Sequence, residues 1–167
     1  LRESLVDAEQ ARRPSYIKYG ATLGVFVDLY RQRVIGLQLI ADFVDGLGQN
    51  AVIPFTELTT LGGNRPLRGF VANRLFDRSA VAAQLEYRWP IWVYLDGTIH
   101  YAMGNVFGER LDGFELQALR QSFGMGFRAN NARDHTFELL IAGGTDTFER
   151  GAEVNSFRFV FGSTAGF

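Results

Sequence analysis

Few residues in this chain are of types that could do chemistry. There are no cysteines and only two histidines, which excludes disulfide scaffolds, thiolate metal sites and cysteine nucleophiles. His100 follows Asp96 on the same face of one extended segment, but four residues of strand span about 13 Å, too far for a catalytic pair. Because no nucleophile stands beside a base, we expect no catalytic, cofactor or metal site, and we predict that the chain is not an enzyme.

The loop over residues 59–77 holds the most suggestive residues. It contains a Gly62-Gly63 pair followed by Leu67-Arg68-Gly69-Phe70. Glycine permits a positive φ and close backbone approach, and arginine offers a planar fork of donors that suits a carboxylate. Glu86 and Asp96, on the inward faces of the next two strands, are the candidate partners of Arg68. From the residues alone, the alternative is an arginine on a solvated loop with no defined partner.

The elements that must position this loop are long strands. From Tyr16 to Asp28, apolar side chains alternate with small or polar ones, and a period of two predicts a strand. That strand is roughly 40 Å long, whereas about 9 to 11 tilted residues cross a bilayer. The alternation recurs, most weakly near 52–58. The total of eight strands is even, as in bacterial outer-membrane barrels: 16–28, 35–43, 52–58, 81–89, 93–103, 119–129, 135–142 and 156–161.

The two faces of these strands differ in a way that favours a membrane barrel. The outward faces carry Leu, Val, Ile and Phe, with Tyr and Trp near several strand ends, as in an aromatic girdle. The inward faces are poor in Lys and mix small residues with charges of both signs, which suits a crowded lumen. The net charge of -1 gives no reason to expect nucleic acid as a partner. No apolar run approaches the roughly 18 to 20 residues of a membrane-spanning helix.

The connections divide by length. With a start in the periplasm, the inner turns are 46–50, 89–92 and 130–134, and the outer connections are 30–33, 59–77, 107–113 and 146–153. Residues 1–13 are predicted to form a polar N-terminal periplasmic segment, helical or irregular. Residues 14–167 are predicted to form an all-β, antiparallel transmembrane barrel of eight strands. A soluble β-sandwich or lipocalin-like ligand-binding barrel is the alternative from another class.

The loop and the strand after it resemble a known family. The Gly-Gly pair, the Arg68-Gly69-Phe70 triplet and the strand ending Leu85–Ile91 look like the BamA and two-partner-secretion transporter superfamily of outer-membrane assembly factors, which includes bacterial surface antigens. The resemblance runs from about Pro54 to the C-terminal residue and matches the second half of a barrel with twice as many strands. It implies that the loop folds back into the barrel, with Arg68 in an inward salt bridge. The final aromatic residues are similar to the family's closing strand and assembly signal: Phe157, Phe159, Phe161 and Phe167.

Two departures from the family weigh against protein insertion or secretion. The family often has an aspartate on the inward face of the strand after Pro90, where this chain has Ala102. The chain also has no pattern like the periplasmic POTRA domains that receive client proteins in the family.

Size limits the function that the resemblance implies. An eight-stranded barrel is just wide enough for its own side chains, so the loop stays outside, the chain is part of a larger protein, or several copies associate. The resemblance implies an outer-membrane module of a Gram-negative bacterium that self-associates and acts on lipid organisation, in transport or as a pore. Expected partners are membrane lipid, including lipopolysaccharide, further copies of the chain, and the outer-membrane assembly machinery during biogenesis. The alternative is the C-terminal half of a protein insertase or translocase.

Overall fold

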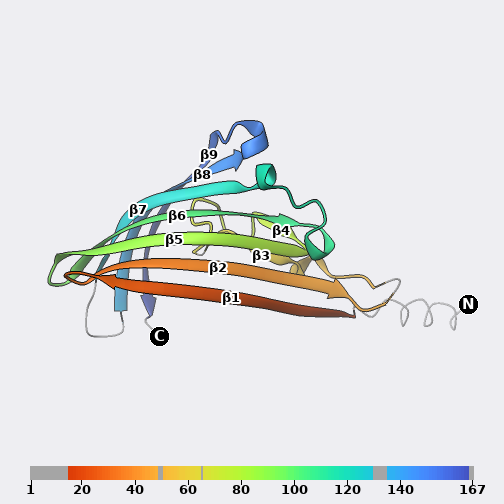
Figure 1. Cartoon of the computed structure of the whole chain (residues 1–167), viewed down its shortest axis with the longest axis horizontal. Helices are drawn as coiled ribbons and strands as arrows, with labels where there is room; N and C mark the ends of the chain where they lie inside the picture. Colours follow the sequence, from red (N-terminus) through yellow and green to blue (C-terminus); the bar gives the residue numbers. More distant parts are fainter. Residues whose placement is uncertain (1–14, 49–50, 65, 130–134, 166–167) are drawn as a thin grey trace, which may run out of the picture.

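The computed structural model describes residues 15–48, 51–64, 66–129 and 135–165. They form an all-β fold dominated by one antiparallel sheet (Figure 1). Its seven strands lie side by side in chain order: β1 (Tyr16–Leu29), β2 (Arg33–Gly46), β5 (Ser79–Trp92), β6 (Leu95–Phe107), β7 (Arg120–Ala129), β8 (His135–Thr147) and β9 (Val154–Ala165). The predicted segment 1–13 lies outside the described residues.

Short elements occupy the connections. In the loop between β2 and β5, β3 (Thr59–Leu61) pairs with β4 (Leu75–Asp77). Single 3-10 turns are η1 (Phe55–Glu57), η2 (Glu109–Leu111), η3 (Leu116–Ala118) and η4 (Phe148–Arg150). None of the helical turns in the described part of the chain has the length and hydropathy needed to cross a membrane.

The long strands follow the alternation in the sequence. β1 has 14 residues, about 46 Å of extended chain, and pairs with β2 in unbroken register from Tyr16 opposite Gly46 to Leu29 opposite Arg33. Burial alternates along β5, where Ala82 and Gln84 are buried and Leu85 is exposed. A strand places successive side chains on opposite faces, so the sheet has one face of apolar, exposed side chains and an opposite face that is covered from β5 to β9 but not on β1. Because the sheet is curved (Figure 1), we call these the convex face and the concave face.

The predicted strand at 52–58 is wrong. Residues 51–54 have no regular structure, and Phe55–Glu57 forms the 3-10 turn η1. Pro54 precedes that turn, and a proline has no backbone N–H to donate to a neighbouring strand. The described sheet therefore has seven strands where eight were predicted.

The sheet is not closed. β1 pairs only with β2 and β9 pairs only with β8, so each has a free edge among the described residues. Seven is an odd number, and neighbouring strands alternate in direction, so β1 and β9 run in the same direction. An antiparallel closure would need an odd number of further strands between them. The eight-stranded closed barrel remains a prediction.

All the long connections lie at one end of the sheet. β1 to β2, β5 to β6 and β7 to β8 are joined by three, two and five residues at what we call the short-turn end. β2 to β5, β6 to β7 and β8 to β9 are joined by longer segments at the long-connection end. The prediction had placed 30–33 with the outer connections and 46–50 with the inner turns. The structure exchanges these two, because the false strand at 52–58 inverted the direction of the two strands before it. The predicted turn at 89–92 also moves, to residues 93–94.

The core lies between the loop and the concave face. Leu67 and Phe70 of the loop are fully buried against Ala80 and Ala102 of β5 and β6. Small residues on these strands leave room for the loop, which takes the place of the large inward side chains that would otherwise fill the space. The fold therefore positions one feature above all others: the tip of the loop.

Candidate functional site

The loop tip is a closed turn fixed by its own backbone and by β9. Gly62 and Gly63 have φ of 108° and 92°, values that side chains disfavour, and they reverse the chain. The N–H of Gly63 donates to the carbonyl of Phe70 at 2.9 Å. The Nη1 of Arg158 on β9 donates to the carbonyls of Gly63, Arg68 and Phe70 at 2.6, 3.3 and 3.1 Å. One cation thus holds both sides of the turn.

Arg68 points from this turn into the sheet. It is only 2% exposed. Its Nη2 lies 2.9 Å from Oε2 of Glu86 on β5, and its Nη1 lies 3.3 Å from Oε1 of Glu138 on β8. Its Nε donates to the carbonyl of Asn64 in the same loop at 2.9 Å. The guanidinium therefore joins two strands that are not neighbours and the loop itself.

Both glutamates are shared with a second arginine. Arg88 donates to Oε1 of Glu86 at 2.9 Å, and Arg128 donates to Oε1 of Glu138 at 3.2 Å. Three cations and two carboxylates thus form a chain of charge-assisted hydrogen bonds across the concave face, from β5 to β8. Removing one member of such a buried network leaves the others uncompensated, which is more costly than the loss of a surface pair. We call this network the arginine lock.

The residue after Arg68 brings the loop into direct contact with the sheet backbone. The N–H of Gly69 donates to Oγ of Ser122 on β7 at 2.8 Å, and its carbonyl accepts from Oγ of Ser156 on β9 at 2.7 Å. A Cβ at Gly69 would lie 2.1 Å from the carbonyl oxygen of Gly143, so only glycine fits here. Phe70 packs in the same way on Gly144. The Arg-Gly-Phe triplet therefore uses a charge, a close backbone approach and a buried ring together.

The structure brings Arg68 to one of the two acids that the sequence suggested. Glu86 is a contact of Arg68, whereas Asp96 lies nearer the short-turn end, opposite Pro90 and Arg128 in the register. The second contact, Glu138, was not named as a candidate. A signal for it existed: it is the acid on the inward side of the segment 135–142, in register with Arg128.

The residue at position 102, an alanine, bears on why Arg68 pairs with Glu138. It occupies the position where the related family often has an aspartate, and it is fully buried in the core cluster with Leu67 and Phe70. A methyl group there packs against the loop and offers Arg68 no oxygen. The carboxylate that completes the lock comes instead from Glu138, two strands further along the sheet.

His100 does not join the lock through a hydrogen bond. His100, opposite Glu86 in the register, is 1% exposed, and its ring lies against Gly124. Neither ring nitrogen has a hydrogen-bond partner among the described residues. Over the same residues, no group of three His, Asp or Glu side chains is arranged to hold a metal ion. The contacts of Arg68, Gly69 and Phe70 fix the loop to the sheet.

The aromatic residues of the closing strand lie on the convex face. Phe157, Phe159 and Phe161 are exposed on β9, and the ring of Phe161 contacts Phe137 of β8 edge to face at 4.9 Å. Phe167 lies outside the described residues. This ladder continues a convex face that is apolar on every strand of the sheet.

Comparison with known proteins identifies the family to which this architecture belongs. No curated protein matches the chain. A family model described as the Omp85 superfamily domain matches residues 8–164, nearly the whole chain. The family contains the BamA-like and two-partner-secretion barrels, so the resemblance carried by the Arg68 loop is confirmed. The chain belongs to the Omp85 superfamily of outer-membrane β-barrel proteins.

Proposed function

We propose that this chain is a wall segment of a larger outer-membrane barrel that a second copy completes, and that the arginine lock holds the loop in the lumen as a constriction. The observation that carries the proposal is the locked loop, which fills the hollow of a sheet with two free edges. The barrel acts as a conduit or pore and not as an enzyme. It lies in the outer membrane of a Gram-negative bacterium, with lipid around it and the assembly machinery as its partner during biogenesis.

The width of the sheet supports a barrel larger than eight strands. The loop contacts β5, β7, β8 and β9 through Glu86, Ser122, Glu138 and Arg158. An eight-stranded barrel has an interior just wide enough for its own side chains or one small ligand, which is too narrow for a loop of this length. A wall that encloses the loop as well must contain more strands, and the free edges of β1 and β9 are where further strands can add.

The convex face supports the proposed location in a membrane. Leu23, Leu37 and Phe159 are exposed near the middle of their strands, and large apolar side chains continue across the sheet. Contiguous exposed apolar surface on this scale is unfavourable in water and is expected where lipid is the solvent. A lipocalin-like ligand binder would require a polar outer face, so it gains no support.

A second copy would pair in one specific way. Two copies related by rotation about the membrane normal place β1 of one beside β9 of the other, and these strands run in the same direction. The seams would therefore be parallel unless each copy adds one more strand. Parallel pairing is slightly less stable per residue than antiparallel pairing, so the seams are the weakest places in the wall.

Cysteine crosslinking tests the seam. The chain has no cysteine, so introduced thiols are unique. We expect Val25→Cys on β1 with Phe159→Cys on β9 to give a disulfide-linked dimer in membranes, because each lies on the convex face of an edge strand. The matched control, Leu85→Cys with Met125→Cys, places thiols on interior strands and should leave a monomer. A detergent-solubilised monomer by mass, with no crosslink across several β1 and β9 positions, would contradict the second copy.

Conductance tests the role of the loop. In planar bilayers, Arg68→Ala should increase single-channel conductance or its fluctuations, because the loop no longer stays fixed to Glu86 and Glu138. Arg68→Lys should give an intermediate value, since a lysine cannot reach both carboxylates with a planar fork. Equal conductance for all three proteins, with a loop shown by proteolysis to be released, would exclude the constriction.

The free edges favour one second candidate, the C-terminal half of a protein insertase or translocase. An unpaired edge strand presents a row of backbone donors and acceptors that can template an incoming strand. In that case the remaining strands belong to the same polypeptide, the particle contains a single copy, and edge cysteines crosslink to a client and not to a second copy.

A further inference from the structure

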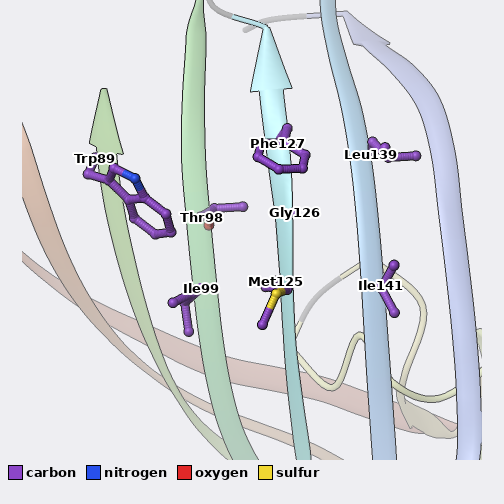
Figure 2. Close-up of a pocket in the computed structure, with 8 residues that line it drawn as sticks. All are labelled: Trp89, Thr98, Ile99, Met125, Gly126, Phe127, Leu139 and Ile141. Carbon is purple, nitrogen blue, oxygen red and sulfur yellow. The ribbon is translucent and has the colours of Figure 1, made fainter. Parts of the chain in front are cut away.

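A second feature lies on the opposite face of the sheet from the arginine lock. It is an apolar hollow of about 280 Å³ on the convex face, across β5 to β8 near the short-turn end (Figure 2). Its walls are outward side chains of four strands: Trp89, Ile99, Met125, Phe127, Leu139 and Ile141. Thr98 and Gly126, which face each other in the register, form its floor. In Figure 2 the wall side chains surround the space between them.

One glycine explains how the hollow is shaped on an otherwise continuous face. A Cβ at Gly97 would lie 2.4 Å from the ring of Trp89, so the indole lies flat over this glycine and forms one wall. The hollow therefore depends on the backbone and on a tryptophan held in place, and not on the chance orientation of flexible side chains.

The chemistry of the hollow selects its occupant. No charged residue lines it, and of its lining residues only Trp89 and Thr98 have polar side-chain atoms, the Thr98 hydroxyl being buried on the concave side of the sheet. A phosphate, sugar or peptide would lose its hydrogen bonds to water and find few in return. An aliphatic chain loses none, and it gains dispersion contacts on several sides, where a flat wall offers one.

The position of the hollow indicates which lipid leaflet would supply the aliphatic chain. It is continuous with the apolar convex face, which meets lipid in the proposed membrane location. Trp92 and Tyr94 mark the short-turn end, where an aromatic girdle meets the headgroups. Trp89 lies three residues further along β5, about 10 Å into the hydrocarbon. Short turns face the periplasm in bacterial barrels, so the leaflet at this depth is the periplasmic one.

We infer that the hollow is a binding site for one acyl chain of a phospholipid from the periplasmic leaflet. The inference rests on the proposed membrane location. It goes beyond general contact with lipid, because it assigns one chain to a defined place on the wall, with Trp89 against it. Such a chain fills the hollow from Ile99 to Leu139 and leaves its headgroup near the short turns.

Tryptophan fluorescence tests the inference directly, because Trp89 and Trp92 are the two tryptophans of the chain. The Trp92→Phe protein, in phosphatidylcholine vesicles with mid-chain brominated lipid, reports quenching of Trp89 alone. Filling the hollow with Ile99→Phe and Leu139→Phe should reduce this quenching about twofold, since the chain moves beyond contact distance, about 3.5–4 Å, of the indole. The matched control is Val25→Phe with Leu37→Phe, two exposed positions opposite each other on β1 and β2. It should leave the quenching unchanged.

The other outcomes separate the site from the membrane location. Strong quenching of Trp89 that the filling variant leaves unchanged would overturn the site, because bulk lipid would then account for the signal. A filling variant that changes the particle mass as well would also overturn it, since the hollow would then hold a neighbouring copy. If brominated lipid quenches neither Trp89 nor Trp92 in the Trp89→Phe protein, the membrane location fails, and the site with it.

Discussion

The part of the sheet from β5 to β9 and the part formed by β1 and β2 share one hydrogen-bonded ladder but differ in how they are stabilised. From β5 to β9, the loop covers the concave face, and buried groups include Arg68, Phe70 and Ser122. On β1, nearly every side chain on both faces is exposed. The ring of Phe26, itself 71% exposed, covers Gly36 on the concave side.

This difference shows which part of the molecule can stand alone. An edge strand that is exposed on both faces has backbone groups and apolar side chains without partners, and such edges favour pairing with further strands. The lock supplies β5 to β9 with a core inside one chain. β1 and β2 must obtain theirs from lipid and from further strands. The loop therefore divides one sheet into a self-supported part and a dependent part.

The largest effect should come from breaking the lock on the self-supported side. Arg68→Ala leaves the carboxylates of Glu86 and Glu138 without their central cation, a change that costs about 3–5 kcal/mol for buried pairs. Denaturant unfolding in detergent should show this loss, and protease should cut within residues 59–77. Arg78→Ala is the control, because that arginine pairs with Glu109 at the surface and should matter little. Equal stability of the two variants would mean that the lock does not hold the loop.

The stability of the dependent part, β1 and β2, should depend on the lipid that covers its convex face. Leu23→Arg on the convex face of β1 should destabilise the protein in bilayers by about 2–4 kcal/mol, the cost of an arginine at the midplane. Thr22→Arg, one residue away on the concave face, should be tolerated. Folding yield into vesicles measures both variants. Similar yields would show that lipid does not cover the convex face of β1.

Disrupting the close backbone contact under the loop should destabilise the protein less. Gly69→Ala places a Cβ against the carbonyl of Gly143, and overpacking of this kind costs about 1–3 kcal/mol. Gly162→Ala is the matched change on β9, where a Cβ meets nothing within 4 Å. Thermal unfolding should distinguish the two variants. If Gly69→Ala is as stable as Gly162→Ala, the tip does not seat on β8 as closely as described.

The smallest effect concerns a surface ion pair that links β1 to the β2–β5 connection. Lys18 lies 2.8 Å from Glu57, and hydrogen bonds from Lys18 and from Tyr16 lower the pKa of the Glu57 carboxyl. A lowered pKa means that the contact stabilises the fold at neutral pH and that this contribution is lost as the pH falls through the lowered value. NMR titration of Glu57 should show the shift, and Lys18→Met should move the pKa back up. An unchanged pKa would mean that the pair is not formed.

Much of this architecture could be predicted from single residues and their spacing. The alternation from Tyr16 onward predicts long strands with one apolar face, and the alternating burial along β5 agrees with it. The loop triplet Arg68-Gly69-Phe70 pointed to the family and to Glu86 as a partner. The segment 52–58 misled the prediction, because short apolar runs do not separate strand from turn without their neighbours. That error changed the strand count and the assignment of two connections.

The sequence by itself determined the residue types, the period of two and therefore the two faces of the sheet, since a strand orients its side chains locally. Only the tertiary structure decided which residues meet across it. Glu138 joins Arg68 because the curvature of the sheet brings β8 toward the loop, and Ala102 lies under Leu67 and Phe70 because the loop needs a small neighbour there. Likewise, the direction of β1 relative to β9 depends on the whole strand count, which no local pattern records. Contacts between distant segments depend on curvature, register and topology together, and these are properties of the folded chain.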